Sequence, residues 1–380
     1  MNKRLYMPDG VRVMAIGLIM WFHIWQQSWL TPAINLGALS IDLSPAVRTG
    51  YMLVDIMLML SGYLLFMPIA RGAHLDTAQF YKKRLIRILP CYLLSVFVML
   101  FCFALPNGEY AARADMWKDL ITHLTFTHTF FTDTYVSTRL NVVLWTLAIE
   151  MQFYLVFPLL ARAFKARPVA SYLAMTAAAL AFRKFVAAGR SDIDLFLNQL
   201  PGMLDVYANG MMAALITAET ERHEQGKYSR IFYTAVLMFA FFQLWLLMKS
   251  QYAMSFPMEA RKAGQLQHRF ELSALGALIL VSGENSFLYI KRIFGNRVTR
   301  FLSDISFNTY IWHQVLAVKL KEWKIQNYIS DTPQSAGEMP WQLHYTITCF
   351  FLDIILAILL TYLFDSPITK KLTKICIRRP

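Results

Sequence analysis

Arg12 and His23 stand eleven residues apart in the first apolar segment of the chain, at residues 11–25. Eleven residues of α-helix turn through about 1100°, so the two side chains share one helix face, about 16 Å apart along the axis. A guanidinium is a permanent cation that binds anions, and an imidazole can accept or donate a proton near neutral pH. The spacing therefore predicts an anion-binding group aligned with a proton-transferring group on one helix.

Ionisable residues recur inside other apolar segments of the chain. Each one costs about 2.5 kcal/mol or more at the centre of a bilayer, so it needs a partner or a water-filled cavity. A snorkelling arginine or a packing histidine explains Arg12 or His23 alone, but neither role requires the two to be aligned. Such groups outnumber the needs of a purely structural bundle, so we expect chemistry among them. The other members are Asp55, Glu150, Asp205, His313 and Asp353.

Two more patterns carry possible chemistry. Arg84 and Arg87 lie three residues apart in a basic segment and face the same way on a helix. Guanidiniums so placed can hold a phosphate or pyrophosphate, although anchoring at the cytoplasmic membrane surface explains the same charges. Glu150 lies in an aromatic and aliphatic segment. It could orient an imidazole, hold a cation, accept hydrogen bonds from a sugar, or form a structural ion pair with an arginine.

Membrane-spanning helices must position these groups. A chain with 57% hydrophobic and 16% charged residues is too apolar for a soluble domain of 380 residues. Its long apolar runs predict an all-α integral membrane protein, a bundle of about ten transmembrane helices. The runs lie near residues 11–30, 50–69, 88–105, 142–160, 169–187, 200–218, 231–249, 270–287, 301–318 and 342–364.

Basic residues give the predicted orientation of these helices. They concentrate in alternate connecting segments, beginning with the N-terminus, so both termini are predicted to be cytoplasmic and the protein to lie in the cell membrane. Loops that face anionic lipid account for the net charge of +13 without a nucleic-acid partner. The spans leave no room for an appended soluble domain, so we expect residues 1–380 to form one membrane domain. Residues 116–126 predict a short amphipathic helix on the outer surface.

The four cysteines lack paired spacing, so we expect neither a disulfide nor a metal site.

Five segments together resemble the membrane acyltransferase-3 family. Arg12 and His23 look like its Arg-x10-His motif, and residues 145–154 resemble its Trp-(Ser/Thr)-Leu-x-x-Glu-x-Gln-Phe-Tyr stretch. The others look like the Asp, apolar run and Ser-Gly-aromatic pattern of its second helix, its cytoplasmic Arg-x-x-Arg segment, and its late Ser-Tyr-x-x-Tyr-(Leu/Ile)-Trp-His signature. They lie at residues 54–63, 84–90 and 305–313.

The resemblance implies an acyltransferase that takes an acyl group, expected to be acetyl, from cytoplasmic acyl-coenzyme A. The acceptor would be a hydroxyl of an extracytoplasmic cell-surface glycan or a related, lipid-linked molecule. The implied catalytic residues are His23, as general base or transient acyl carrier, with Glu150 or Asp55 to orient it. The implied donor-binding residues are Arg12, Arg84 and Arg87. The implied substrate-binding residues are Trp145, Ser61, Tyr310 and His313.

Two positions depart from the family pattern. Met151 stands where a second glutamate is frequent, and Gln314-Val315 replaces a Trp-Pro or similar pair. Some family members also carry an extracytoplasmic hydrolase-like domain that completes transfer, and we expect none in this chain. Acyl delivery would then occur within the membrane core or on a separate protein. The same buried groups would also serve a proton-coupled transporter or flippase. One such alternative is a module that moves an amino acid, like that of the serine racemases linked to vancomycin resistance.

Overall fold

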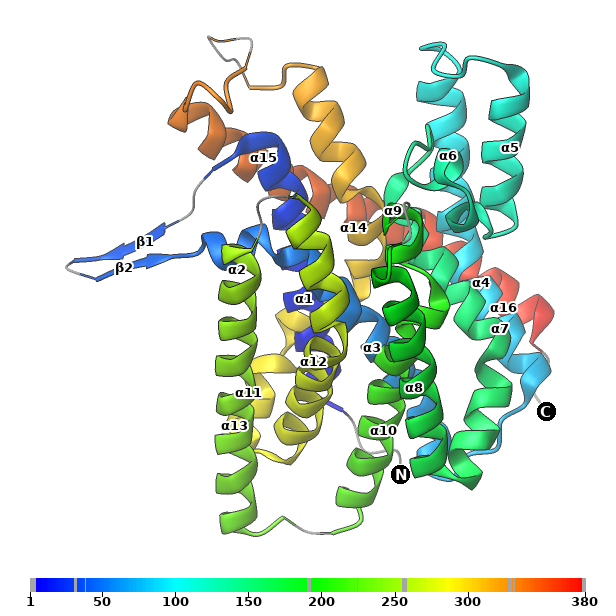
Figure 1. Ribbon diagram of the computed structural model, residues 1–380, viewed down its shortest axis with the longest axis vertical. Helices are drawn as coiled ribbons and strands as arrows, with labels where there is room; N and C mark the ends of the chain where they lie inside the picture. The colour runs from blue at the N-terminus through cyan, green and yellow to red at the C-terminus, as the bar shows by residue number, and fades with distance from the viewer. Residues whose placement is uncertain are drawn as a thin grey trace. The chain divides into compact units, whose positions relative to one another are not determined.

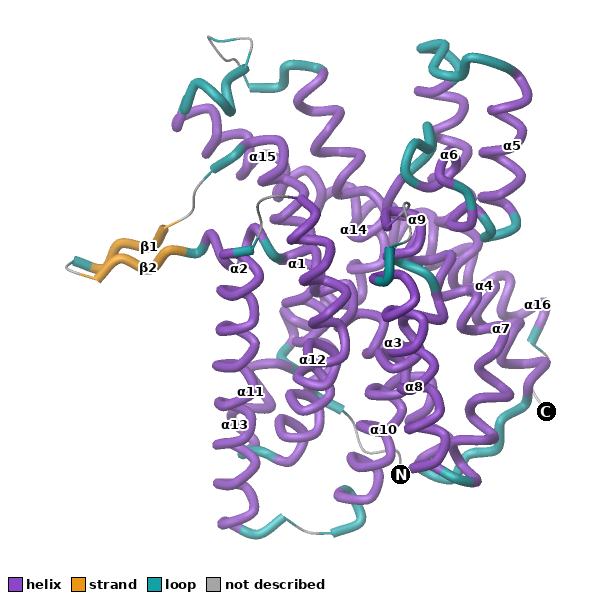
Figure 2. The backbone as a smooth tube through the Cα atoms, viewed as in Figure 1, coloured by secondary structure: helices purple, strands orange, loops and turns teal. Residues whose placement is uncertain are grey.

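A computed structural model describes residues 5–30, 33–37, 39–189, 193–223, 225–254, 258–326, 330 and 332–377. Regular structure in these ranges is nearly all helical, as Figures 1 and 2 show, and this confirms the all-α class. The strands described are β1 (Ala33–Leu36) and β2 (Leu39–Asp42), which pair antiparallel.

The helices follow one another along the chain with short connections. They are α1 (Met7–Ser28), α2 (Ser44–Arg48), α3 (Val54–Ala70), α4 (Thr77–Val98), α5 (Arg113–Leu124), α6 (Thr132–Tyr135), α7 (Trp145–Ala166), α8 (Pro168–Ala187), α9 (Ile193–Leu197), α10 (Leu204–Thr220), α11 (Lys227–Ala253), α12 (Met258–Asn285), α13 (Leu288–Phe294), α14 (Arg297–Glu322), α15 (Met339–Leu359) and α16 (Ser366–Cys376). Short 3-10 or π-helical segments adjoin several of them, at Gly50–Leu53, Met99–Ala104, His128–Phe130, Val142–Leu144, Leu200–Met203 and Leu360–Asp365.

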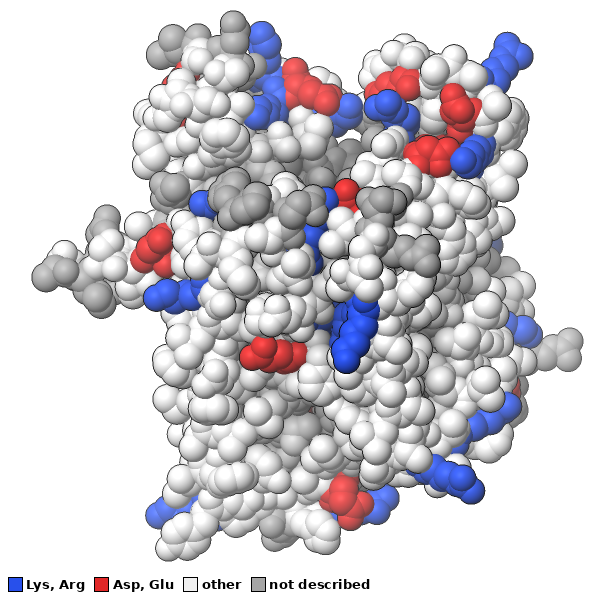
Figure 3. All heavy atoms as spheres, in the orientation of Figure 1, with Lys and Arg blue, Asp and Glu red and all other residues white. Residues whose placement is uncertain are grey.

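Six helical stretches in the described residues are long and apolar enough to cross a membrane. They correspond to six of the ten predicted runs, and Figure 3 shows the wide uncharged surface expected of such helices. The remaining four runs also form helices, α1, α10, α12 and α14, but charged or polar residues interrupt them or they are shorter. The count of ten therefore stays a prediction. The six stretches are Gly50–Ala70, Thr77–Ala104, Val142–Ala166, Pro168–Ala187, Lys227–Ala253 and Met339–Cys376.

The chain divides into two compact units. The first comprises Met1–Ser61 and Ile216–Ile358, and the second comprises Gly62–Leu215 and Leu359–Pro380. Each unit is held together by its own helix contacts. In the first unit α1 packs against α14 and α11 packs against α12, and in the second α7 packs against α8 and α16 against α4.

Helix α1 of the first unit has sequence-encoded ends. Pro8 stands in its first turn, where a backbone N–H would have no helical partner. The Glu284 carboxylate accepts the N–H groups of Tyr6 at 2.5 Å and Met7 at 2.7 Å, so it caps this end from α12. Trp29 ends the helix with φ at 53°, and its N–H donates to the Trp25 carbonyl.

Helices α1 and α14 run parallel in the first unit. Arg12 Nη1 donates to Ser303 Oγ at 3.4 Å, and Lys321 Nζ donates to the Gln27 carbonyl at 3.0 Å, so the contacts ascend both helices in the same direction. Helix α15 runs antiparallel to α14, because Tyr345 Oη donates to the Ala317 carbonyl at 2.5 Å while Lys321 lies over the Trp341 ring. A buried apolar cluster joins the three helices, at Met20, Ile24, Ala317, Leu320, Trp341, Tyr345 and Cys349.

The second unit has its own buried ion pair. Arg183 on α8 donates from Nη1 to Asp205 Oδ1 at 3.0 Å, from Nη2 to Asp205 Oδ2, and from Nη1 to the Gly202 carbonyl at 2.9 Å. Asp205, one of the ionisable residues noted in the sequence, is thus satisfied within the fold. Nearby, Gly62 allows α3 to approach α10 closely, because a Cβ there would lie 2.6 Å from the Tyr207 carbonyl oxygen.

Candidate active site

The imidazoles of His23 on α1 and His313 on α14 face each other in the first unit. Their ring centroids lie 5.1 Å apart, with an angle of 51° between the ring planes. His313 is 2% exposed, and His23 is half-buried. Because 290 residues separate them in sequence, the parallel packing of α1 against α14 is what brings them together.

One ring nitrogen of each histidine, Nδ1, has a hydrogen-bond partner. His23 Nδ1 lies 2.8 Å from Gln26 Oε1, and His313 Nδ1 lies 2.8 Å from the Tyr310 carbonyl oxygen. Both partners are acceptors, so each Nδ1 carries a hydrogen, and in the neutral ring Nε2 keeps its lone pair. His313 Nε2 is buried without a hydrogen-bond partner among the described residues. In the neutral form, each ring of the pair can therefore accept a proton at Nε2.

Arg12 lies on the same side of α1, as the eleven-residue spacing predicts. It is half-buried and contacts Ser303 of α14, ten residues before His313. The ring of Tyr310 lies 5.6 Å from that of His313, so this predicted substrate-binding residue borders the pair. The structure thus gathers Arg12, His23, Tyr310 and His313 along the contact between α1 and α14. Ser61, also predicted to bind substrate, is half-buried on α3.

Asp55 has a strong partner that the sequence did not reveal. Arg269 on α12 donates from Nε to Asp55 Oδ2 at 3.1 Å, and the two residues are 0% and 2% exposed. A buried carboxylate is stable in its charged form only with such compensation. The signal that could have indicated Arg269 was an arginine directly before the predicted run 270–287. The predicted role of Asp55 in orienting an imidazole stays a prediction.

The other predicted residues lie in the second unit. Tyr154 Oη donates to Glu150 Oε1 one turn away on α7, and the guanidinium of Arg84 lies 5.9 Å from the Tyr154 ring centre. Glu150, Tyr154 and Arg84 therefore form one connected group across α4 and α7. Arg87 is 47% exposed and lies 3.8 Å from the carboxylate of Asp365.

Trp145 begins α7, and its ring lies 6.3 Å from that of Tyr135.

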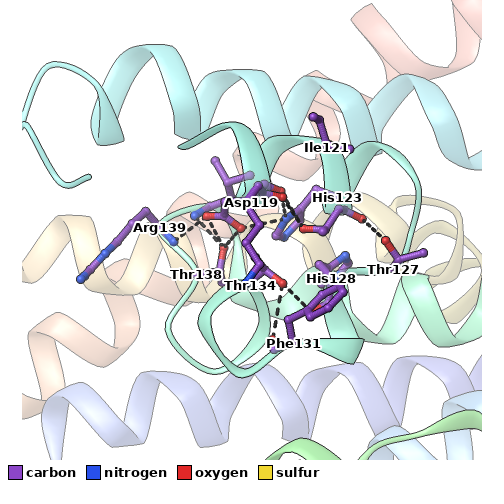
Figure 4. Close-up of polar contacts among 12 residues, drawn as sticks. Asp119, Ile121, His123, Thr127, His128, Phe131, Thr134, Thr138 and Arg139 are labelled. Atoms are coloured by element: carbon purple, nitrogen blue, oxygen red, sulfur yellow. Dashed lines mark hydrogen bonds and ion pairs between the residues drawn. The ribbon is translucent and has the colours of Figure 1, made fainter. Parts of the chain in front are cut away.

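A second histidine pair lies in the segment between α4 and α7, for which the sequence predicts only a surface helix. The rings of His123 and His128 stack 3.9 Å apart and nearly parallel, at 0% and 1% exposure. His123 Nδ1 lies 2.8 Å from the Asp119 carbonyl oxygen and 3.1 Å from Asp119 Oδ1 (Figure 4). Helix α5 is present as predicted, but it buries these polar residues and exposes Trp117 and Ile121.

No three His, Cys, Asp or Glu side chains lie together as a metal site would require, within the residues that the structure describes. None of the four cysteines forms a disulfide in the described residues.

Comparison with known proteins decides the family. The acyltransferase-3 family model, described as an acyltransferase domain, matches residues 5–364. The chain belongs to this family. It therefore carries an acyltransferase domain of this family, and its long apolar helices make it a multi-pass membrane protein.

Individual relatives of this acyltransferase cover less of it. The chain is 29% identical over 170 residues to the O-acetyltransferase OatA of Staphylococcus aureus, in strains NCTC 8325 / PS 47, COL and MRSA252. The match covers 40% of this chain and 24% of each relative, so the chain spans about a quarter of the length of the curated relatives it matches. No solved structure matches the acyltransferase.

Proposed function

We propose that this acyltransferase is a membrane O-acetyltransferase that moves an acetyl group from cytoplasmic acetyl-coenzyme A to a hydroxyl of an extracytoplasmic acceptor. A cell-surface glycan, or a lipid-linked precursor of one, is the proposed acceptor. The observation that carries the proposal is the His23–His313 pair, in which each ring is held at Nδ1 and its Nε2 is left to accept a proton in the neutral form. The similarity to an O-acetyltransferase supports the choice of reaction.

The proposed reaction begins with His23 as general base. His23 Nε2 takes the proton of the acceptor hydroxyl while that oxygen attacks the thioester carbonyl. The carbon–sulfur bond then breaks, coenzyme A leaves as a thiolate, and the imidazolium returns the proton to the sulfur. Gln26 and the Tyr310 carbonyl hold the two rings by their Nδ1 hydrogens. His313 stabilises the intermediate imidazolium, because its Nε2 can accept a hydrogen bond from the newly protonated nitrogen.

Arg12 is proposed to bind the donor. It stands eleven residues before His23 on α1, at the end that the basic residues predict to be cytoplasmic. A guanidinium there would hold an anionic or carbonyl group of acetyl-coenzyme A while the acyl carbon reaches His23. Arg84 and Arg87 are the alternative proposed donor contact, although the ion pair of Arg87 with Asp365 must open for phosphate to bind it.

The proposed function is tested by comparing cells that make the protein with cells that lack it and with cells that make His23→Ala at equal membrane levels. Mass spectrometry of surface glycans, peptidoglycan and lipids should show one ester that requires both the protein and His23. Its loss from one component would name the acceptor. Unchanged esters together with altered amino-acid uptake would instead favour the transporter alternative.

A further inference from the structure

A polar cavity of about 490 Å³ lies in the first unit, away from the histidine pair. It forms where the end of α10, the start of α11, the end of α12 and α13 meet. This volume falls in the range of sites for small molecules and cofactors, and a single phosphate ion would fill only part of it. The charged residues in its wall are Glu221, Arg222, Arg230, Glu284 and Lys291.

The cations of this cavity suit phosphate. Arg230 on α11 is exposed and pairs with no carboxylate in the part of the chain that the structure describes. Arg222 Nη1 lies 2.7 Å from Glu219 Oε2, and both of these side chains are mostly exposed. This ion pair is therefore weak enough to open for a ligand. Arginine is well suited to phosphate because its planar fork can donate two parallel hydrogen bonds.

The carboxylates of the cavity suit hydrogen-bond donors on the same ligand. Glu284 uses Oε1 for the N–H groups of Tyr6 and Met7, so the positive end of α1 compensates part of its charge. Lys291 attracts the Glu284 carboxylate, whereas Glu221 repels it. A ligand that presents both phosphates and hydroxyl or amino groups therefore matches the wall better than a simple anion.

The position of Glu284 links the cavity to the active site. Glu284 contacts the first residue of α1, and the helical rise places Arg12 about 7.5 Å and His23 about 24 Å further along the same helix. An elongated ligand with its anionic end in the cavity could thus extend along α1 toward the histidines. All of these residues belong to the first unit.

We propose that this cavity binds the phosphate-bearing nucleotide end of the coenzyme A donor, with Arg222 and Arg230 on its phosphates. The proposal rests on the proposed function, because it assumes that donor. The ribose hydroxyls and the adenine amino group can donate hydrogen bonds to the carboxylates. An ethanolamine lipid headgroup has similar chemistry, but it is much smaller than the cavity.

Binding of coenzyme A to the full-length protein in phosphatidylcholine nanodiscs tests the proposal. Coenzyme A carries no acyl group, so calorimetry measures binding without turnover. Arg230→Gln should weaken binding about tenfold, and Arg230→Glu should weaken it further because it adds a repulsive charge. Arg292→Gln is the matched control, since Arg292 is an exposed cation on α13 outside the cavity wall, and it should bind normally. Lys291→Gln replaces Arg230→Gln if that variant fails to fold.

The outcomes separate the cavity from the proposed reaction. Normal binding by the Arg230 variants, with loss only in Arg84→Gln or Arg87→Gln, would overturn the cavity proposal and leave the reaction standing. Competition by phosphatidylethanolamine that depends on Arg230 would make the cavity a headgroup site and would also overturn it. His23→Ala should bind coenzyme A normally while losing transfer. If the parent protein binds no coenzyme A, the proposed donor itself is wrong.

Discussion

Arg269 and Asp55 form a buried ion pair in the first unit, with Arg269 Nε 3.1 Å from Asp55 Oδ2 and almost no exposure of either residue. Removal of one partner leaves an uncompensated charge in an apolar interior. We expect Arg269→Met to destabilise the protein by about 3–5 kcal/mol, and Arg269→Met with Asp55→Leu to recover much of that loss. Thermal unfolding in detergent measures both.

The matched control for this pair is Glu271→Gln. Glu271 is a mostly exposed acid on the same helix, 3.0 Å from His268, and its loss should change stability by less than about 1 kcal/mol. If Asp55→Asn abolished acyl transfer while stability stayed unchanged, Asp55 would act in catalysis rather than in support of the fold.

The histidine pair predicts unequal effects on transfer. His23→Gln should lower the rate of acyl transfer by about 10²–10⁴-fold, because it removes the proposed base. His313→Gln should cost less, since His313 only stabilises the charge on its neighbour. Acetyl transfer by purified protein at matched concentrations measures both. His344→Gln, which changes an exposed histidine on α15, should retain full activity. Activity at the level of the parent protein in all three variants would remove both histidines from the mechanism.

Glu150 and Tyr154 are expected to act as one unit. Tyr154 Oη donates to Glu150 Oε1, so Tyr154→Phe and Glu150→Gln each weaken the same contact. Each should lower transfer about tenfold if this contact positions substrate, and the double variant should be no worse than the worse single variant. Additive losses in this double-mutant cycle would show that Glu150 works independently of the tyrosine.

The stacked rings of His123, on α5, and His128 predict a loss of stability in acid. Burial, and secondarily the neighbouring His123, lower the pKa of His128 well below its usual value of 6.5. The folded state therefore favours the neutral ring, so stability is full above about pH 6.5 and falls as the pH drops below that value. The slope should approach about 1.4 kcal/mol per pH unit for this group. Hydrogen exchange in residues 113–138 measures it.

His128→Phe should remove most of that pH dependence while keeping the stacked ring. His223→Phe changes an exposed histidine, so it should leave the dependence intact. An unchanged acid response in His128→Phe would assign the sensitivity to another group.

Local periodicity was enough to predict one face of the site, but not the partners opposite it. The Arg12–His23 alignment follows from the pitch of a single helix, and the structure places both residues against α14. From the residues alone His313 was one of several ionisable groups in apolar segments, and its pairing with His23 could not be predicted, because that contact depends on packing between distant segments. Arg269 sits beside a predicted apolar run, where its charge reads equally well as a flanking anchor.

The burial of polar residues in the outer segment was also not predictable from the sequence. The apolar spacing of residues 116–126 correctly predicts helix α5, yet it assigns the polar face to solvent. In the structure Asp119 and His123 turn inward, because Tyr110, Thr138 and the backbone of Arg139 bond to the Asp119 carboxylate. Such a network joins separate turns of the chain, so no repeat within one helix encodes it.

The parallel packing of α1 and α14 has a consequence for parity. Two parallel helices that both span a membrane start on the same side of it. The chain must therefore cross the membrane an even number of times between the start of the first helix and the start of the second. The ten predicted runs meet this condition, since α1 is the first and α14 the ninth. The antiparallel α15 then follows as the tenth. Any topology that omits a single intervening crossing would turn α14 upside down against α1 and separate Arg12 from Ser303.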